Sequence, residues 1–357
     1  GIANLGLQRP DGVVGPGDAA LSNPFRERTP FALADLQPVW PLQLPRTPPE
    51  IQRHPQEFHS GAVIVMDSKS GKFVDVDGIR TRYFEAGSGE TVLLVHGGNF
   101  GSPHCCDCSL DWNLNFDGLA EHFHVVALDK LGQGFTAIPS SQNDYTMDAV
   151  VRHTLRFIET LNLSDVHVVG HSRGGYLTCR LTLEYADYVK SCTIIDSNTG
   201  APGQGRNHIE FDDTPKPFLS RASQRWVLEG YSYNSKVVTE EWLDEMEQIA
   251  AIPTYKQAVE LMEEGGLNER LFQPSIARGR AEMFDWLMDR GMQRPTLMVW
   301  GLNDPTATLD QGFAYYEILS LKEPRTEMHI FNESGHFTYR EHPAAFNETL
   351  RSFIASC

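Results

Sequence analysis

The chain has 357 residues, of which 41% are hydrophobic, so it is large for one compact domain and can bury a full apolar core. Its 47 acidic and 30 basic residues give a net charge of −17, which disfavours nucleic acid and anionic membranes as partners. No run of about 18 apolar residues occurs, so no transmembrane helix is expected. We expect a cytoplasmic protein. A removed targeting segment is left open, because the first residue is Gly1 rather than methionine.

Residues 1–60 are predicted to form a proline-rich N-terminal arm. Ten of the 21 prolines fall in this segment, too closely spaced for regular helix or strand. Four large apolar residues, Phe25, Phe31, Trp40 and Leu42, give the arm something to bury. We favour packing of the arm on its own domain, and the alternative is an arm that stabilises a homodimer.

Residues 61–196 and 293–357 are predicted to form an α/β core. A short apolar run at 62–66 comes first, and Asp77-Gly78 between two alternating runs (73–84) predicts a hairpin. Apolar strands then alternate with helical patterns, which indicates a mostly parallel sheet covered on both faces. The expected strands are 92–95, 125–128, 166–169, 193–195, 297–300 and 328–331. Right-handed crossovers place all their carboxyl ends at one edge, where ligands bind in such sheets.

Residues 197–292 interrupt this strand rhythm and are predicted to form a helical lid. Thr239 is a suitable N-cap for a helix that opens with acidic residues. Helical spacing of apolar residues recurs at 255–262 and 277–288. The large apolar residues of this segment are expected mainly to pack against one another, with some of them facing a pocket.

The segment Val166–Gly175 carries a G-x-S-x-G box between an apolar strand pattern and a helical one. This is the sequence context of a nucleophile elbow, in which the turn is too tight for side chains at Gly170 and Gly174. Ser172 is therefore the predicted nucleophile. A serine hydroxyl needs a general base to remove its proton as it attacks.

An acid and a histidine follow Ser172 in the order that this architecture requires. Asp304 comes after the predicted strand 297–300, and His336 comes after the predicted strand 328–331. We predict that His336 is the base and that Asp304 orients it and stabilises its cation. Asp196, which also follows a strand, is the second choice for the acid.

The strand that ends in Val95 leads into His96-Gly97-Gly98, where backbone amides can approach a reacting carbonyl. An amide of Gly98 or Gly97 is expected to pair with the amide of Arg173 as an oxyanion hole. His96 is interpreted as a structural residue that ties this loop down.

Three of the six cysteines, Cys105, Cys106 and Cys108, cluster in the loop after the oxyanion strand. Free thiols are the favoured interpretation; a local disulfide and a metal site are the alternatives. Because no second Cys/His pair has zinc-like spacing, we expect no metal.

The G-x-S-x-G box, the order of serine, acid and histidine, and the oxyanion loop resemble the α/β-hydrolase superfamily. A narrower resemblance, to the meta-cleavage product hydrolases and related serine esterases, is carried by the segments Ala127–Thr136, Trp300–Asp304, Gly335–Phe337 and Arg340–Pro343. The resemblance covers roughly residues 70 to 357. It implies a serine hydrolase without a cofactor that acts on a small-molecule substrate, in a family that cleaves carbon–carbon bonds of ring-opened aromatic dienoates. It also implies substrate contacts at Asn99, Phe100 and Phe337.

The resemblance also implies that the dienoate carboxylate is held by a lid arginine and by polar groups of the oxyanion loop. Candidates here are Arg221, Arg225 and Arg278, each of which could equally be a solvated surface charge. Three functions are open: a carbon–carbon bond hydrolase, a carboxylesterase for an aromatic or alkyl ester, and a non-catalytic receptor on a hydrolase scaffold. The intact serine, acid and histidine disfavour the receptor.

Overall fold

The computed structural model describes residues 66, 67, 69–206 and 211–357. The predicted N-terminal arm (1–60) and most of the apolar run at 62–66 lie outside these residues, and Met66 itself is not in a strand. Within the described part of the chain, no helix is both long enough and apolar enough to cross a membrane.

An eight-stranded sheet forms the centre of the described core. Its strands are β1 (Lys72–Val76), β2 (Ile79–Ala86), β3 (Thr91–Val95), β4 (His124–Leu128), β5 (Val166–His171), β6 (Val189–Ile195), β7 (Thr296–Gly301) and β8 (Thr326–Phe331). They lie in the order β1-β2-β4-β3-β5-β6-β7-β8. The first two pairings are antiparallel and the other pairings are parallel, which confirms the predicted mostly parallel sheet. The β1–β2 hairpin turns at Asp77 and Gly78, both with positive φ, as a tight two-residue hairpin requires.

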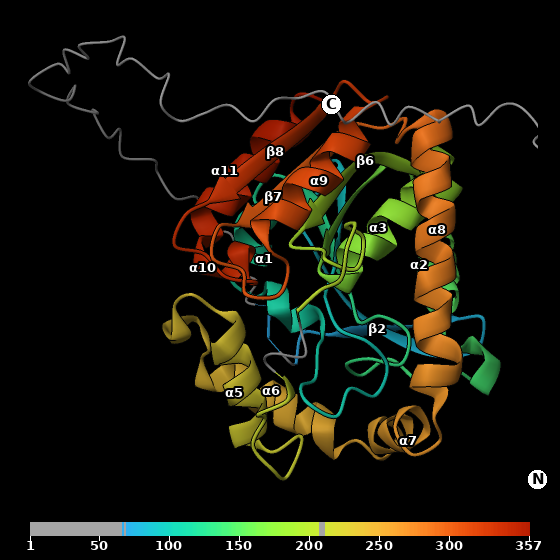
Figure 1. Cartoon of the computed structure of the whole chain (residues 1–357), viewed down its shortest axis with the longest axis vertical. Helices are drawn as coiled ribbons and strands as arrows, with labels where there is room; N and C mark the ends of the chain where they lie inside the picture. Colours follow the sequence, from blue (N-terminus) through green and yellow to red (C-terminus); the bar gives the residue numbers. More distant parts are fainter. Residues whose placement is uncertain (1–65, 68, 207–210) are drawn as a thin grey trace, which may run out of the picture. The chain divides into compact units, whose positions relative to one another are not determined.

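Alternate residues of each central strand enter two separate apolar clusters. In β3, Leu93 and Val95 belong to one cluster, and Val92 and Leu94 belong to the other. The first cluster is covered by α2 (Met147–Thr160), α3 (Arg173–Glu184), α8 (Gln273–Arg290) and α9 (Leu309–Ser320). The second is covered by α1 (Phe116–Ala120), α10 (Thr338–Glu341) and α11 (Pro343–Ile354), on the other side of the sheet (Figure 1). Both faces are therefore buried at the centre of the sheet, which explains why the central strands β3, β4 and β7 are almost uniformly apolar.

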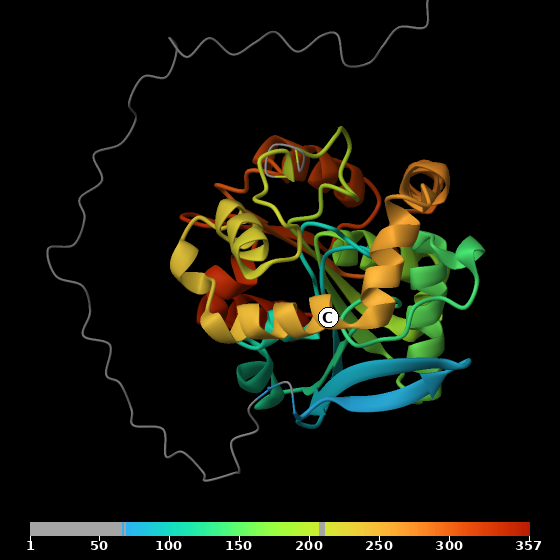
Figure 2. The same ribbon diagram turned by 90° about the horizontal axis from the view of Figure 1, so that it is seen from below.

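Between β6 and β7 the chain forms a helical insertion, here defined as α5 (Arg221–Tyr231), α6 (Glu240–Ala251), α7 (Pro253–Met262) and α8. Figure 1 shows α5, α6 and α7 gathered at one end of the sheet, and Figure 2 looks onto that end. The Thr239 hydroxyl accepts a hydrogen bond from the Trp242 amide, as predicted for the N-cap of α6. The helices expected from the sequence in this segment are confirmed. Their action as a lid stays a prediction.

Buried polar contacts fasten the insertion to the core. Arg82 of β2 lies between two carboxylates, with its Nε 2.6 Å from Asp129 and its Nη1 2.7 Å from Glu245 of α6. Burial opposes the charge of Arg82, but the two carboxylates outweigh burial, so the pKa of Arg82 is raised. The Trp242 indole, also on α6, donates to Asp111 at 2.9 Å. The position of α6 is therefore fixed by charge as well as by apolar packing.

Replacing Arg82 with methionine is expected to lower the free energy of unfolding by about 3–5 kcal/mol, because it leaves two carboxylates buried without their cation. Urea denaturation measures this change. Arg351→Met, which breaks only an exposed pair with Glu348, is the matched control and should have little effect. Equal stability of both variants would contradict the anchoring role of Arg82.

Candidate active site

Ser172 occupies the turn between β5 and α3 in a strained backbone conformation, with φ 54° and ψ −119°. Two hydrogen bonds hold it there. Its amide donates to the Ile195 carbonyl at 2.8 Å, and its carbonyl accepts from the Ser197 hydroxyl at 2.6 Å. Non-glycine residues rarely adopt a positive φ, and such residues concentrate at functional sites.

The two glycines of the box make this turn sterically feasible. A side chain at Gly170 would collide with the backbone of Gly174, and one at Gly174 would collide with the backbone of Val95. The crowding arises because α3 starts directly against β3 and β5. The prediction that these two positions must lack side chains is confirmed.

His336 and Asp304 are joined by a short hydrogen bond. His336 Nδ1 lies 2.6 Å from Asp304 Oδ2. The other carboxylate oxygen accepts from the amides of Thr306 and Ala307 at 2.7 and 2.8 Å and from the Thr306 hydroxyl at 3.0 Å. Since an ionised carboxylate only accepts, the His336 proton belongs on Nδ1, and Nε2 is left to act as a base.

Asp196, the second choice for the acid, does not bond to His336. Its two oxygens accept from the Gly301 amide at 2.8 Å and the Thr338 hydroxyl at 2.6 Å. Burial, and then the nearby charge of Asp304, raise the pKa of Asp196 well above its usual range. The geometry therefore favours Asp304 as the partner of the histidine and gives Asp196 a structural position under it.

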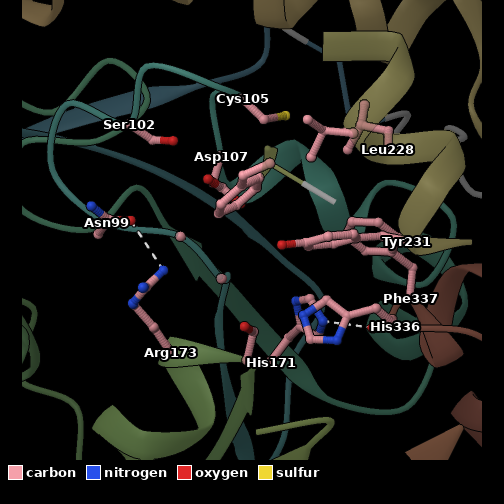
Figure 3. Close-up of a pocket in the computed structure, with 15 residues that line it drawn as sticks. Asn99, Ser102, Cys105, Asp107, His171, Arg173, Leu228, Tyr231, His336 and Phe337 are labelled. Carbon is pink, nitrogen blue, oxygen red and sulfur yellow. Dashed lines mark hydrogen bonds between the residues drawn. The ribbon is translucent and has the colours of Figure 1, made fainter. Parts of the chain in front are cut away.

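Ser172 and His336 line one pocket, which Figure 3 shows in close-up. One wall is largely apolar and comes mainly from the insertion, and the opposite wall is polar and comes from the loops after β3 and β5. The apolar wall comprises Phe211, Val227, Leu228, Tyr231 and Phe337, and the polar wall comprises Asn99, Ser102, Asp107 and Arg173. Among the described residues no hydrogen bond joins the Ser172 hydroxyl to His336. Such contacts often tighten only when substrate binds.

The glycines of the predicted oxyanion loop border Ser172 closely. A Cβ added to Gly97 would lie 3.2 Å from the Ser172 Cβ, and Gly98 has a φ of 71°. The Gly98 carbonyl accepts from the Lys130 ammonium at 3.0 Å. The Arg173 amide is the first of α3, where a helix leaves amides without an intrahelical acceptor. These positions suit an oxyanion hole, and that role stays a prediction.

His96 ties the oxyanion loop to the strand beside it. Its Nδ1 lies 2.9 Å from the Gly97 carbonyl, and its Nε2 accepts from the Lys130 amide at 3.1 Å. Burial lowers the pKa of His96 well below its usual range, so the ring is neutral. These contacts agree with the structural role predicted for His96.

The three predicted substrate contacts have different positions. Asn99 and Phe337 line the pocket, whereas Phe100 does not. The ring of Phe100 is fully buried against Tyr145 and Phe272, at centroid distances of 5.1 and 5.8 Å. The prediction for Phe100 is therefore corrected: this side chain supports the loop from beneath and does not face substrate.

His171 and Asp107 are among the pocket residues that the sequence reasoning missed. His171, the variable residue of the box before the serine, donates from Nε2 to the His336 carbonyl at 2.7 Å. Burial lowers the pKa of His171 well below its usual range, so it is a neutral ring beside the base. Asp107 faces the same pocket, and burial raises its pKa. The position of His171 inside the box could have indicated it. Asp107 lies in an irregular loop without a motif.

The cysteine cluster consists of free thiols, as favoured from the sequence. Cys105, Cys106 and Cys108 are buried, and Cys105 borders the pocket. Burial raises the pKa of the Cys105 thiol well above its usual range, so it is protonated and unreactive. Among the described residues no group of three or more His, Cys, Asp or Glu side chains is arranged to hold a metal ion.

None of the three candidate lid arginines lines the pocket. Arg221 forms ion pairs with Glu240, Asp244 and Glu247. Arg225 pairs with Glu229 and Glu240, and Arg278 pairs with Asp148. The interpretation of each as a surface charge therefore holds.

Comparison with known proteins agrees with the fold described above. A family model described as "alpha/beta hydrolase fold" matches residues 90–343, which include the box, Asp304 and His336. The chain belongs to the α/β-hydrolase family. This result confirms the predicted fold class.

Several characterised hydrolases are similar to this α/β-hydrolase over most of its length. The 2-hydroxy-6-oxo-6-(2'-aminophenyl)hexa-2,4-dienoic acid hydrolase of Metapseudomonas resinovorans is 25% identical over 297 residues, which cover 80% of this chain and 90% of that protein. The 2-hydroxymuconate semialdehyde hydrolase of Pseudomonas sp. strain CF600 is 23% identical over 80% of this chain and 94% of its own. The predicted resemblance to meta-cleavage product hydrolases, and with it the prediction of a serine hydrolase, is confirmed.

A solved structure shows the same fold. The meta-cleavage product hydrolase from Pseudomonas fluorescens IP01, as a serine-to-alanine mutant complexed with acetates, superimposes with a TM-score of 0.66. It is 23% identical, and the match covers 81% of this chain and 98% of that one.

Proposed function

We propose that this chain hydrolyses a carbon–carbon bond in a small, apolar or aromatic keto acid, with Ser172 as nucleophile, His336 as base and Asp304 as its orienting partner. The observation that carries the proposal is the 2.6 Å contact between His336 Nδ1 and Asp304, in a pocket that Ser172 also lines. Because Nδ1 is engaged by Asp304, the Nε2 of His336 is left as the nitrogen that can act as the base.

In the proposed reaction the substrate first ketonises to a form with two carbonyl groups. The new conjugated ketone can accept the electrons of the bond that breaks. The other carbonyl, next to that bond, is the one that is attacked. The Ser172 hydroxyl then attacks that carbonyl while His336 takes its proton. The amides of Gly98 or Gly97 and of Arg173 hold the oxyanion. Cleavage releases a dienolate that is protonated, and water returns the acyl-serine to free enzyme and carboxylic acid. One water is consumed in total.

The pocket walls support an apolar substrate body with one polar end. Leu228, Tyr231 and Phe337 offer apolar surface on one side, and the other side carries amide and charged groups. Relatives named for hydroxy-oxo-dienoic acid substrates favour the carbon–carbon reaction over other hydrolyses on the same fold.

A carboxylesterase is the second candidate. It would use the same three residues through an acyl-enzyme, without ketonisation. The observation that favours it is the engagement of Arg221, Arg225 and Arg278 in ion pairs away from the pocket, so that none of these three holds a dienoate carboxylate.

A two-substrate panel separates the candidates. We expect the purified enzyme to bleach a 2-hydroxy-6-oxo-6-phenylhexa-2,4-dienoate with a kcat/KM at least about 100-fold above that for p-nitrophenyl butyrate, because transition-state contacts to the acid end are absent from the simple ester. Stopped-flow absorbance follows both reactions. The Ser172→Ala protein is the blank for each. Ester cleavage with no loss of dienoate absorbance would establish the esterase instead.

A further inference from the structure

The polar wall of the pocket contains the guanidinium of Arg173, which forms no ion pair with a carboxylate among the described residues. Arg173 follows Ser172 directly, and its Nη1 donates to Asn99 Oδ1 at 3.0 Å (Figure 3). Its Nε is buried and has no hydrogen-bond acceptor among the described residues. Burial lowers the pKa of Arg173, and within the described part of the chain it forms no ion pair.

Arg173 is half-buried, and withdrawing a cation from water without a partner charge is costly. The fully buried Arg82 offers a comparison. Arg82 is matched by two carboxylates, whereas Arg173 has a single neutral amide. Asp107 in the same pocket acts on the charge of Arg173, but among the described residues the two form no ion pair, and the Arg173 Nε is left without an acceptor. The positive charge of Arg173 would also attract a substrate anion at short range, against the repulsion from a chain of net charge −17.

We propose that Arg173 and Asn99 form a subsite for a carboxylate of the substrate, in place of an arginine on the helical insertion. This inference rests on the proposed hydrolase function and names the substrate class of the same pocket: an acid whose carboxylate is docked beside the nucleophile. A guanidinium has five N–H donors, so Arg173 can keep its bond to Asn99 and still give two parallel hydrogen bonds to a carboxylate.

The surroundings of Arg173 keep its guanidinium in place. The Asn99 amide nitrogen donates to the Phe100 carbonyl at 3.1 Å, which turns Asn99 Oδ1 toward Arg173. The ring of Phe272 lies under the guanidinium at 5.9 Å. A cation fixed in this way loses little entropy when an anion binds.

Asp107 limits where the carboxylate can dock. It faces the same pocket, and its carboxyl group lies against Gly98, so it would repel an acid on its own side. The cations that face it are Lys130, Arg173 and, when protonated, His336. The acid must therefore bind on the side of Arg173, with its apolar part extending toward Leu228 and Phe337.

A binding experiment tests the subsite without any chemistry. In the Ser172→Ala protein, calorimetry compares 6-oxo-6-phenylhexanoate with its methyl ester, which lacks the negative charge and carries one added methyl group. We expect the acid to bind about 10- to 100-fold more tightly than the ester, as for hydrogen bonds to a charged group. Arg173→Met in this background should abolish the preference, and Arg173→Lys should keep part of it.

Two further variants make the result specific. Arg221→Met removes an equal charge from α5, outside the pocket, and should leave the preference unchanged. Asp107→Asn should increase the preference for the acid, because it removes the competing negative charge. Circular dichroism checks that each variant is folded.

An acid preference that survives Arg173→Met, or equal binding of acid and ester before mutation, would overturn the subsite. Failure of the proposed function would look different: the protein with Ser172 intact would leave the dienoate unchanged, whatever the binding ratio. The two ideas are therefore tested separately.

Discussion

Turnover should fall by about 10⁵-fold or more when Ser172 is replaced by alanine, because the attacking oxygen is removed while the pocket and the His336–Asp304 pair remain. The elbow conformation depends on backbone hydrogen bonds to Ile195 and Ser197, which alanine retains. The loss should therefore be in kcat, and a substrate analogue should still bind.

Initial rates with the preferred substrate measure this effect, and mass spectrometry after treatment with a fluorophosphonate shows whether Ser172 is the residue that is modified. Ser191→Ala is the matched control, since it removes a buried serine hydroxyl on β6 that bonds His167. Retention of more than a hundredth of the activity by Ser172→Ala, or labelling at another residue, would rule out the nucleophile.

Asp304→Asn is expected to reduce kcat by about 10⁴-fold. Asp304 accepts a hydrogen bond from the protonated Nδ1 of His336. An asparagine in the same place can instead turn its NH₂ group toward the ring. The ring would then hold its proton on Nε2, where it could no longer accept one from Ser172. Loss of the negative charge also destabilises the imidazolium that forms during attack.

Asp196→Asn separates this effect from a general loss of buried charge. Asp196 is as deeply buried as Asp304, but it bonds Gly301 and Thr338 rather than His336. We expect its replacement to change stability more than kcat. A severe loss of kcat for Asp196→Asn together with a mild one for Asp304→Asn would reverse the assignment of the acid.

The sheet and the elbow were predictable because local patterns determine them. Apolar runs marked β3 to β8, Asp77-Gly78 marked the hairpin, and the strand–turn–helix context made one G-x-S-x-G box specific. The chain order of serine, acid and histidine then allowed Asp304 and His336 to be selected. All of these features depend on neighbouring residues or on the common edge of a parallel sheet.

The pocket walls were less predictable because side-chain direction in irregular loops depends on distant contacts. Phe100 turns into the core because Tyr145 and Phe272 provide an apolar surface there. Asp107 faces the pocket from a loop without periodicity. The Arg173 side chain was overlooked because only its amide was expected to matter.

The buried contacts of α6 have a consequence for attempts to exchange specificity between related hydrolases. Glu245 and Trp242 reach acceptors and donors on the core side, namely Arg82 and Asp111. An insertion transplanted from a homologue would leave Arg82 and Asp111 of the core without these partners. Transfer of this insertion to another core would leave Glu245 without its cation. A graft of the helices should therefore include Arg82 and Asp111, the core residues that they contact. In this protein a change of the insertion requires a matching change of the core.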